Sequence, residues 1–246
     1  MELKGKTILI TGASSGIGKA IAKDCIAKGA SIIVFGRFIT KLKEVFKDID
    51  SSRIVFLEID LSDIDSLLDK ISDINNIDAI VHSAGMLELR PLRAIGYDNL
   101  RETMKLNFES PVMLTNFLLK KKKINKGGSI VFISSINGNR IGNVGYLSYA
   151  SSKAALNGAM KVIALELAPK KIRVNSVLPG VIKTEMALKL EESVSKEAIN
   201  EDVKKYPLKS YGIPEDVAHL VNYLISDNSK WVTGSEFVID GGFTLN

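Results

Sequence analysis

The chain of 246 residues carries a formal net charge of +5; 46% of its residues are hydrophobic and 25% are charged. This length and balance indicate a soluble globular protein with a substantial buried core. No apolar run approaches the ~20 residues of a membrane span, the start lacks the features of a signal peptide, and the modest charge does not require nucleic acid as a partner.

Short apolar runs alternate along the chain with longer segments of helical periodicity. The runs are nearly continuous in Val, Ile, Leu and Phe, which is typical of parallel strands covered on both faces. The predicted strands are 6–11, 31–36, 53–59, 78–83, 128–134, 172–178 and 235–240, and the clearest predicted helices are 17–28, 64–74, 100–120 and 151–167. This alternation predicts an α/β chain with a Rossmann-type doubly wound parallel sheet of about seven strands.

The pattern shows no linker or internal repeat, so we expect a single domain over 1–246. The least regular region, 183–210, is charged and only loosely periodic, and we expect it to be a substrate flap. The one cysteine, Cys25, lies in an apolar helical pattern and cannot form an internal disulfide. A buried thiol and a cytoplasmic location are expected from it.

The first predicted strand runs into a glycine turn and then a helix. Gly12 allows a sharp exit from the strand, while Gly16 and Gly18 allow the backbone to approach a phosphate and the helix to pack on the sheet. The N–H groups at the start of that helix would face a pyrophosphate. The turn predicts a dinucleotide site; the alternative is a plain tight turn.

The second predicted strand ends at Gly36 and Arg37, with no carboxylate at this position. An acidic residue here would bind the ribose 2′-hydroxyl of NAD, whereas an arginine accommodates the 2′-phosphate of NADP. Arg37 therefore favours NADP(H), with weaker attraction from Lys41 and Lys43, unless Arg37 only faces solvent.

A tyrosine and a lysine lie four residues apart in a predicted helix, at Tyr149 and Lys153. This spacing places both on one helix face, where the ammonium would lower the phenol pKa toward neutral pH. Tyr146 has Ala150 at the equivalent position and does not meet this condition. Ser135 ends the fifth predicted strand, at the edge where such sheets bind ligands, and its hydroxyl can polarise a carbonyl.

Several motifs follow one another in a definite order. They are TGASSGIG at 11–18, EIDLSD at 58–63, HSAG at 82–85, LNFESP at 106–111, ISS at 133–135, YASSK at 149–153, RVNSVLPGVIKTEM at 173–186 and WVTGSEFVIDGG at 231–242. In these motifs and their order the chain resembles the short-chain dehydrogenase/reductase family over essentially its whole length. The resemblance implies a nicotinamide-dependent oxidoreductase without a metal.

The family's pattern also implies roles for individual residues. The catalytic set would be Asn107, Ser135, Tyr149 and Lys153, in which Lys153 also binds the nicotinamide ribose and Asn107 holds a water that links Lys153 to solvent. The implied cofactor-binding residues are Gly12, Ser14, Ser15, Gly16, Ile17, Gly18, Arg37, Asp60, Leu61, Ser83, Ala84, Gly85, Tyr149, Lys153, Pro179, Gly180, Ile182 and Thr184.

The sequence departs from the family's pattern at two places. His82 and Ser83 replace the usual pair of asparagines, and we expect His82 to be a packed, hydrogen-bonded residue. Ser135 lies fourteen residues before Tyr149, about one more than the family's spacing. The Gly/Asn-rich segment 137–145 can absorb the extra residue. Because Ser134 would be further still from the usual spacing, Ser135 is the predicted catalytic serine.

The predicted function is NADP(H)-dependent interconversion of a carbonyl and a secondary alcohol, for which 3-oxoacyl-[acyl-carrier-protein] reductases are the most familiar match. Carrier proteins are acidic, and a basic surface of Lys120–Lys123, Lys126, Lys170 and Lys171 could match one. Reduction of a sugar, polyol or other small carbonyl is an alternative, as is a non-catalytic NADP-binding regulator. The family commonly forms tetramers, so a homo-oligomer is expected, with 221–225 and the C-terminal strand as candidate contacts.

Overall fold

One parallel sheet organises the computed structural model, which describes residues 2–191 and 195–245. In the described residues its strands are β1 (Thr7–Thr11), β2 (Ser31–Gly36), β3 (Ile54–Glu58), β4 (Ile77–His82), β5 (Ile124–Ile133), β6 (Arg173–Pro179) and β7 (Glu236–Ile239). They lie in the order β3-β2-β1-β4-β5-β6-β7, and every neighbouring pair is parallel. The predicted α/β class, strand number and parallel arrangement are confirmed.

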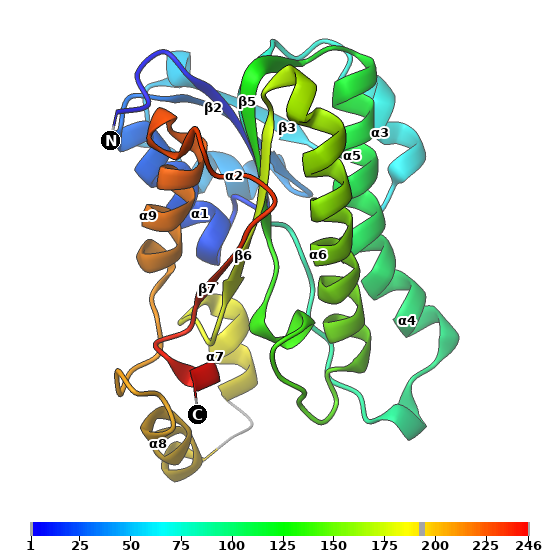
Figure 1. Ribbon diagram of the computed structural model, residues 1–246, viewed down its shortest axis with the longest axis vertical. Helices are drawn as coiled ribbons and strands as arrows, with labels where there is room; N and C mark the ends of the chain where they lie inside the picture. The colour runs from blue at the N-terminus through cyan, green and yellow to red at the C-terminus, as the bar shows by residue number, and fades with distance from the viewer. Residues whose placement is uncertain (1, 192–194, 246) are drawn as a thin grey trace.

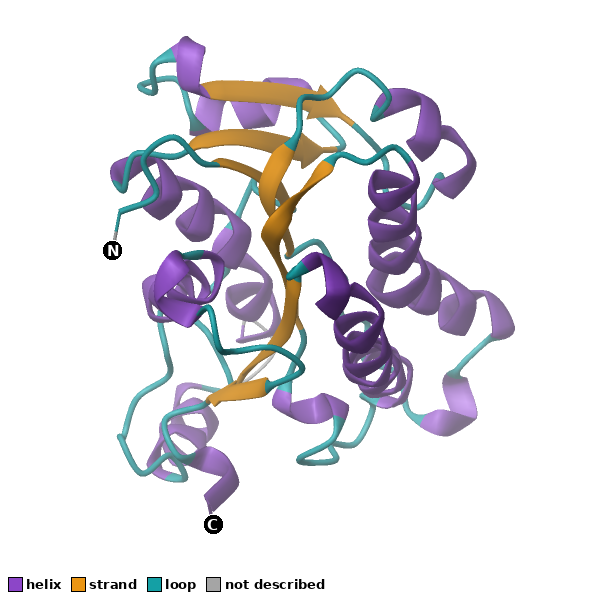
Figure 2. Cartoon of the chain, turned by 45° about the horizontal axis from the view of Figure 1, so that its top comes forward, coloured by secondary structure: helices purple, strands orange, loops and turns teal. Residues whose placement is uncertain are grey.

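Helices cover both faces of this sheet (Figures 1 and 2). They are α1 (Gly16–Ala27), α2 (Ile39–Val45), α3 (Ile64–Lys70), α4 (Tyr97–Met104), α5 (Ser110–Lys120), α6 (Leu147–Leu167), α7 (Glu185–Glu191), α8 (Lys196–Lys204) and α9 (Pro214–Ile225). The α1, α2 and α9 helices share one apolar cluster with the sheet, and α3, α5 and α6 share the other. Successive strand residues point to opposite faces, so Ile8 and Ile10 join the first cluster while Leu9 joins the second.

The segment predicted as one helix, 100–120, contains a π-helical turn at Lys105–Glu109. The backbone N–H of Ser110 donates to the carbonyl of Lys105, five residues back. Pro111 follows, and in a regular helix its ring would clash with the carbonyl of Asn107. The wider turn relieves that clash, and such turns are frequent at functional positions.

Two further expectations differ from the structure. The helix predicted at 151–167 begins earlier, at Leu147, so Tyr149 lies in its first turn. The apolar run 221–225, expected as a subunit contact, is instead part of the internal core: Val221, Leu224 and Ile225 are buried between α9, α1 and the sheet. That expectation is wrong because periodicity alone does not tell an internal apolar face from a subunit contact.

No helix of the described residues is long and apolar enough to cross a membrane.

The strand order reverses direction between β1 and β4. The chain moves outward from β1 through β2 to β3, then returns to place β4 on the other side of β1. The loops after these two strands therefore diverge and leave a crevice at the carboxyl edge of the sheet, which is where open α/β sheets bind ligands.

Candidate active site

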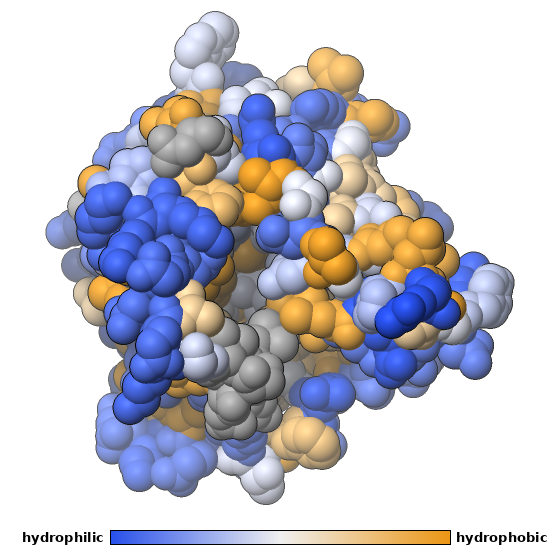
Figure 3. Space-filling model, turned by 90° about the horizontal axis from the view of Figure 1, so that it is seen from below, coloured by the Kyte–Doolittle hydropathy of each residue, from blue (hydrophilic) through white to orange (hydrophobic). Residues whose placement is uncertain are grey.

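A cavity of about 1080 Å³ opens at this carboxyl edge. Seen from the end of the molecule where the strands finish, the surface is hollowed near its centre, with apolar side chains beside the hollow (Figure 3). The lining includes every predicted cofactor-binding residue: Gly12, Ser14, Ser15, Gly16, Ile17, Gly18, Arg37, Asp60, Leu61, Ser83, Ala84, Gly85, Tyr149, Lys153, Pro179, Gly180, Ile182 and Thr184. Ser135 lines it too. Segments far apart in sequence therefore meet around one space.

The glycine turn after β1 has no room for side chains. Gly12 has a φ of +69°, and a Cβ on it would lie 2.8 Å from the Cα of Ala84. A Cβ on Gly18 would lie 2.8 Å from the carbonyl carbon of Gly12. Gly16, with a φ of +49°, faces Thr184 at 3.1 Å from its Cγ2. The three glycines therefore let β1, β4, α1 and the segment after β6 approach one another closely.

The start of α1 faces the cavity. Ser15 occupies the N-cap position, and its side chain makes no capping hydrogen bond. The first backbone N–H groups of a helix lack intrahelical acceptors and carry partial positive charge. With the glycine cradle beneath them, these groups fit the pyrophosphate of a dinucleotide.

Arg37 lies at the end of the cavity bordered by β2 and is exposed, with its Cζ 6.0 Å from the centre of the Phe38 ring. Gly36 beside it carries no carboxylate. One carboxylate does lie nearby, because Glu58 pairs with Gly36 in the β2–β3 register. Its Oε2 accepts a hydrogen bond of 3.0 Å from the N–H of Ile39, at the start of α2. Glu58 therefore caps that helix instead of lining the cavity.

Asp60 lies across the cavity end from Arg37. Its Oδ1 accepts hydrogen bonds from the hydroxyl and the N–H of Ser62, at 2.6 and 2.9 Å. The bond from the Ser62 hydroxyl, and more weakly the charge of Arg37, hold the pKa of the Asp60 carboxyl below its usual value. Asp60 is therefore ionised at neutral pH and available to accept hydrogen bonds.

His82, which stands where the family's pattern has asparagine, is a packed residue as expected. Its ring stacks on Phe132 with centres 4.9 Å apart, and its Nε2 lies 2.9 Å from the Thr115 hydroxyl oxygen. Burial lowers the pKa of the imidazole to about 3. The next two backbone N–H groups, of Ser83 and Ala84, both donate to the Thr11 hydroxyl at 3.1 Å. Thr11 thus holds the strand end in place.

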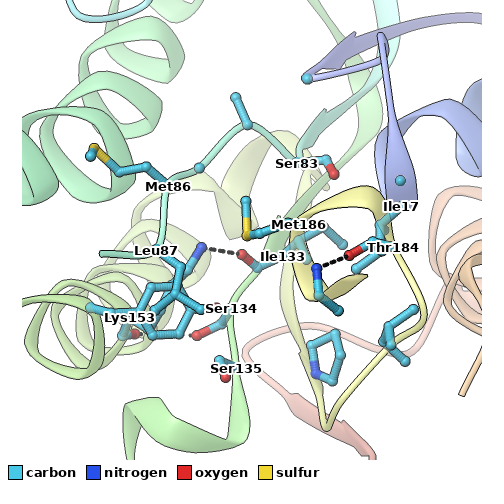
Figure 4. Close-up of a pocket in the computed structure, with 18 of the residues that line it drawn as sticks. Ile17, Ser83, Met86, Leu87, Ile133, Ser134, Ser135, Lys153, Thr184 and Met186 are labelled. Atoms are coloured by element: carbon cyan, nitrogen blue, oxygen red, sulfur yellow. Dashed lines mark hydrogen bonds between the residues drawn. The ribbon is translucent and has the colours of Figure 1, made fainter. Parts of the chain in front are cut away.

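Tyr149, Ser135 and Lys153 meet at the wall formed by α6 and the end of β5. The Ser135 hydroxyl lies close enough to the Tyr149 hydroxyl to lower its pKa. The Lys153 ammonium is buried and donates to the carbonyl of Ile133 at 2.8 Å (Figure 4). Its Nζ lies 5.6 Å from the centre of the Tyr149 ring. The pair predicted from its four-residue spacing therefore lies on one face of α6, and Ser135 reaches Tyr149 from the end of β5.

The acid–base properties of this pair differ in part from the expectation. Burial raises the pKa of the Tyr149 hydroxyl, and the nearby Ser135 hydroxyl offsets this rise only in part. Lys153 does not bring the Tyr149 pKa below its usual value. Its ammonium points to the Ile133 carbonyl and lies over the tyrosine ring instead of beside the hydroxyl. Burial also lowers the pKa of Lys153 to about 8.

The two adjacent serines, Ser134 and Ser135, make different contacts. Ser135 Oγ accepts a hydrogen bond of 3.2 Å from the N–H of Asn137 and contacts Tyr149. Ser134 Oγ donates to the backbone carbonyl of Lys153 at 3.3 Å. The structure thus brings Ser135 to the tyrosine and uses Ser134 to attach the strand end to α6.

Asn107 lies behind the wall of the cavity, in the π-helical turn, and is buried. Its amide accepts from the N–H of Met86 at 2.8 Å and donates to the carbonyl of the same residue at 2.9 Å. It also donates to Ser152 Oγ at 3.1 Å. A Cβ placed on Gly85 would lie 3.2 Å from Asn107 Oδ1 and 3.5 Å from Lys153 Nζ, so both groups border the same backbone.

The predicted flap, 183–210, includes residues 192–194, which lie outside the described residues. On either side of them the chain forms α7 and α8. The flap's ends are joined by backbone hydrogen bonds: Gly212 donates to Val181 at 3.1 Å, and Lys183 donates to Gly212 at 2.9 Å. Thr184, at its start, lies beside Ile17, and Met186 points into the cavity (Figure 4).

Sequence reasoning missed the residues that line the rest of the cavity. They include Tyr146, Met186, Asp202, Tyr206 and Phe243. The Tyr206 ring packs at a tilt of 37° against Phe243, with ring centres 4.7 Å apart, although the two are far apart in sequence. The sequence feature that could have indicated Tyr206 is an aromatic residue within the charged, irregular segment 183–210.

The basic surface of Lys120–Lys123, Lys126, Lys170 and Lys171 lies elsewhere. These lysines lie before β5 and β6 or, for Lys126, at the start of β5, whereas the cavity lies where those strands end. The starts and ends of these strands are at opposite ends of the molecule in Figure 1. A ten-residue strand such as β5 spans ~30 Å. A carrier protein docked on the lysines would have to deliver its substrate across the whole sheet, so that expectation is wrong.

Comparison with known proteins relates the whole chain to a group of reductases. The family model described as Enoyl-(Acyl carrier protein) reductase matches residues 12–244. The 3-oxoacyl-[acyl-carrier-protein] reductase FabG of Rickettsia conorii is 36% identical over 245 residues, covering 100% of this chain and 99% of the relative. The enzyme of the same name from Aquifex aeolicus is 33% identical over 249 residues, covering 98% of each chain.

Solved structures show the same fold. A short-chain dehydrogenase/reductase of Brucella melitensis, described as SDR:Glucose/ribitol dehydrogenase, superposes with a TM-score of 0.91 at 29% identity and covers 98% of each chain. A dehydrogenase/reductase from Sinorhizobium meliloti gives a TM-score of 0.89 at 30% identity, covering 98% of this chain and 96% of the other.

Proposed function

The chain belongs to the short-chain dehydrogenase/reductase family of oxidoreductases, and we propose that it reduces a 3-oxoacyl group carried by an acyl carrier protein, with NADPH as cofactor. The observation that carries this proposal is the meeting of Tyr149, Ser135 and Lys153 at the wall of the dinucleotide-sized cavity. The substrate class comes from the curated relatives, and the preference for NADPH comes from Arg37.

Each residue of this wall has a role in the proposed reaction. NADPH, when bound, supplies the hydride that adds to the carbonyl carbon. Ser135 donates a hydrogen bond to the carbonyl oxygen and holds it beside Tyr149, which gives up its proton to that oxygen. A raised tyrosine pKa keeps this proton in place at neutral pH. The Lys153 ammonium over the ring stabilises the phenolate that remains.

The second candidate is reduction of a sugar, polyol or other small carbonyl. The description of the Brucella structure favours it, as do the polar groups of Tyr146 and Asp202 in the cavity lining. A panel of purified carbonyl substrates separates the candidates: an acyl-carrier-linked or thioester-linked 3-oxoacyl substrate, a ketose and a simple ketone, each followed by the absorbance of the reduced cofactor. Binding of NADPH with no turnover on any of them would favour the non-catalytic regulator.

We expect NADPH to be preferred over NADH by at least ~10-fold in kcat/KM, which corresponds to about 1.4 kcal/mol. Arg37 supplies a planar set of donors that suits the oxygens of a 2′-phosphate, and Gly36 leaves space without a repelling carboxylate. The preference should shrink as salt rises, because Arg37 is exposed. Lys41 adds little, since it lies 3.6 Å from Glu185 in an exposed ion pair.

The double change Gly36→Asp with Arg37→Ile should reverse this preference. It adds a carboxylate for the ribose hydroxyl and removes the phosphate partner. Steady-state kinetics with both cofactors and one substrate, on wild type and double variant, measure the effect; Lys43→Met is the matched control for loss of a nearby charge. Equal use of NADH by the wild type would mean that Arg37 serves only as a solvent-facing residue.

Carbonyl reduction should fall as pH rises through about 8. Burial depresses the pKa of Lys153 to about 8, so the ammonium is present below that pH and is lost above it. Tyr149, whose pKa is raised, stays protonated over the same range, and His82, with a pKa of about 3, stays neutral. The pH profile of kcat/KM for reduction measures this limb. A Lys153→Arg variant that retains turnover should lose the limb; a flat wild-type profile well above 8 would contradict the assignment.

We also propose a homo-oligomer, a dimer or a tetramer, in the cytoplasm. Val162 and Leu165 lie three residues apart on α6, and both are exposed in the chain alone. Burial of these two side chains against a second copy would remove apolar area from water, so we place the subunit contact on this face of α6. The cytoplasmic location is supported by the single, buried Cys25. Light scattering of the purified protein tests the subunit number.

A further inference from the structure

Glu236, at the start of β7, is a nearly buried carboxylate that lies outside the cavity. Its side chain is only 9% exposed, yet three polar side chains surround it. Oε2 accepts a hydrogen bond of 2.7 Å from the Asn139 amide and lies 3.4 Å from Arg140 Nη2. Oε1 lies 3.0 Å from Lys161 Nζ.

These partners come from two elements that carry catalytic groups. Asn139 and Arg140 directly follow the 3₁₀ turn Ile136–Gly138, whose N-cap is Ser135. Lys161 lies on α6, two helical turns beyond Lys153. One carboxylate therefore connects the turn that carries the serine to the helix that carries the tyrosine and the lysine.

The same turn packs directly against the backbone of α6. A Cβ on Gly138 would lie 3.1 Å from the carbonyl carbon of Lys153 and 3.2 Å from the N–H nitrogen of Ala154. Ser134 Oγ donates to the Lys153 carbonyl. Lys153 Nζ also donates to the Ile133 carbonyl at 2.8 Å, so both bonds hold the strand end and not the far side of the turn. The charged contacts of Glu236 attach that far side, at Asn139 and Arg140, to α6.

The Glu236 carboxylate is charged at neutral pH, as an attachment through ion pairs requires. Burial would raise the pKa of the Glu236 carboxyl, but the hydrogen bond from Asn139 and the ion pair with Lys161 outweigh it and hold the pKa below its usual value. The group is therefore charged at neutral pH. Ion pairs of a desolvated carboxylate are screened less than exposed pairs, and removal of one partner is costly.

We propose that Glu236 is a positioning residue for the reductase reaction, which holds the turn after Ser135 against α6 and so keeps the Ser135 hydroxyl on Tyr149. This inference rests on the proposed function for its effect on turnover. Its effect on the tyrosine does not depend on any substrate, because the Ser135 contact lowers the pKa of Tyr149 in the protein by itself.

Glu236→Gln is the first test, since it keeps the shape and removes the charge. The pKa of Tyr149 is measured by NMR titration of ¹³C-labelled tyrosine, in which the Tyr149 signal is the one that disappears in Tyr149→Phe. In Glu236→Gln this pKa should rise by about one unit. Ser135→Ala should raise it too. In alcohol oxidation, which needs the phenolate, kcat should fall about 10-fold at neutral pH as the acidic limb moves up with that pKa. The Kd for NADPH should stay unchanged.

Arg140→Ala and Lys161→Met change the exposed partners of Glu236, so these variants should fold even if Glu236→Gln does not. Each should raise the Tyr149 pKa by less than Glu236→Gln does. Asp227→Asn is the matched control: it removes an exposed carboxylate that pairs with Lys6 at 3.1 Å, away from this turn. An unchanged Tyr149 pKa in Glu236→Gln overturns the inference, even if turnover falls. A shifted pKa in a protein that reduces no carbonyl would keep the inference and overturn the proposed function.

Discussion

Replacing Tyr149 with phenylalanine is expected to lower kcat by at least ~10²-fold, the scale of general acid–base catalysis. The ring and its packing over the Lys153 ammonium remain, but the hydroxyl that contacts Ser135 is lost. The carbonyl oxygen would then have no positioned proton donor. Because the substitution removes one atom from a wall of the cavity, the Kd for NADPH should be nearly unchanged. Single-turnover reduction and a cofactor titration measure the two quantities separately.

Tyr146→Phe is the matched comparison for this result. Its ring meets that of Tyr149 edge-on with centres 6.1 Å apart, and it also lines the cavity, but four residues beyond it stands Ala150. It should lose much less turnover than Tyr149→Phe. Lys153→Met should be as damaging as Tyr149→Phe and should also weaken cofactor binding. Wild-type turnover in Tyr149→Phe on a verified substrate would remove the catalytic assignment.

Gly18→Ala is expected to lower stability by about 1–3 kcal/mol, the usual cost of adding a group to a fully packed site. The added Cβ would meet the carbonyl group of Gly12, with 2.8 Å to its carbon, and backbone there cannot move without displacing Ala84. Since 1 kcal/mol shifts Tm by ~2–4 °C in a chain of this size, the Tm should fall by several degrees. Affinity for NADPH should fall as well, because α1 moves away from the pyrophosphate position.

Gly142→Ala provides the control for this change. Gly142 lies in the loop before α6, and a Cβ there would find nothing within 4 Å. The same substitution should therefore leave stability unchanged or raise it by up to ~1 kcal/mol, since alanine loses less backbone entropy on folding than glycine. Calorimetry of both variants tests the pair. If Gly18→Ala melted at the wild-type temperature, the close approach at this turn would not be a packing constraint.

Features that depend on neighbouring residues could be predicted from the sequence. The strands followed from continuous apolar runs, because both faces of the sheet are covered. The glycine turn followed from its place between β1 and α1, and the Tyr149–Lys153 pair from helical spacing. The resemblance to a family added residues that no local pattern indicates, such as Asp60 and Thr184. All of these residues border the cavity, so the fold class and the cofactor-binding part of the cavity could be predicted without the structure.

Contacts between residues far apart in the chain were decided only by the tertiary structure. Glu236 meets Asn139 across 97 positions, and nothing in either neighbourhood predicts that contact. The direction of the Tyr149 pKa shift depends on where burial places the hydroxyl and the Lys153 ammonium, not on their spacing. The basic surface of Lys120–Lys123, Lys126, Lys170 and Lys171 was misplaced for the same reason: sequence shows that charges cluster, but the direction of the parallel strands decides at which end of the sheet they lie.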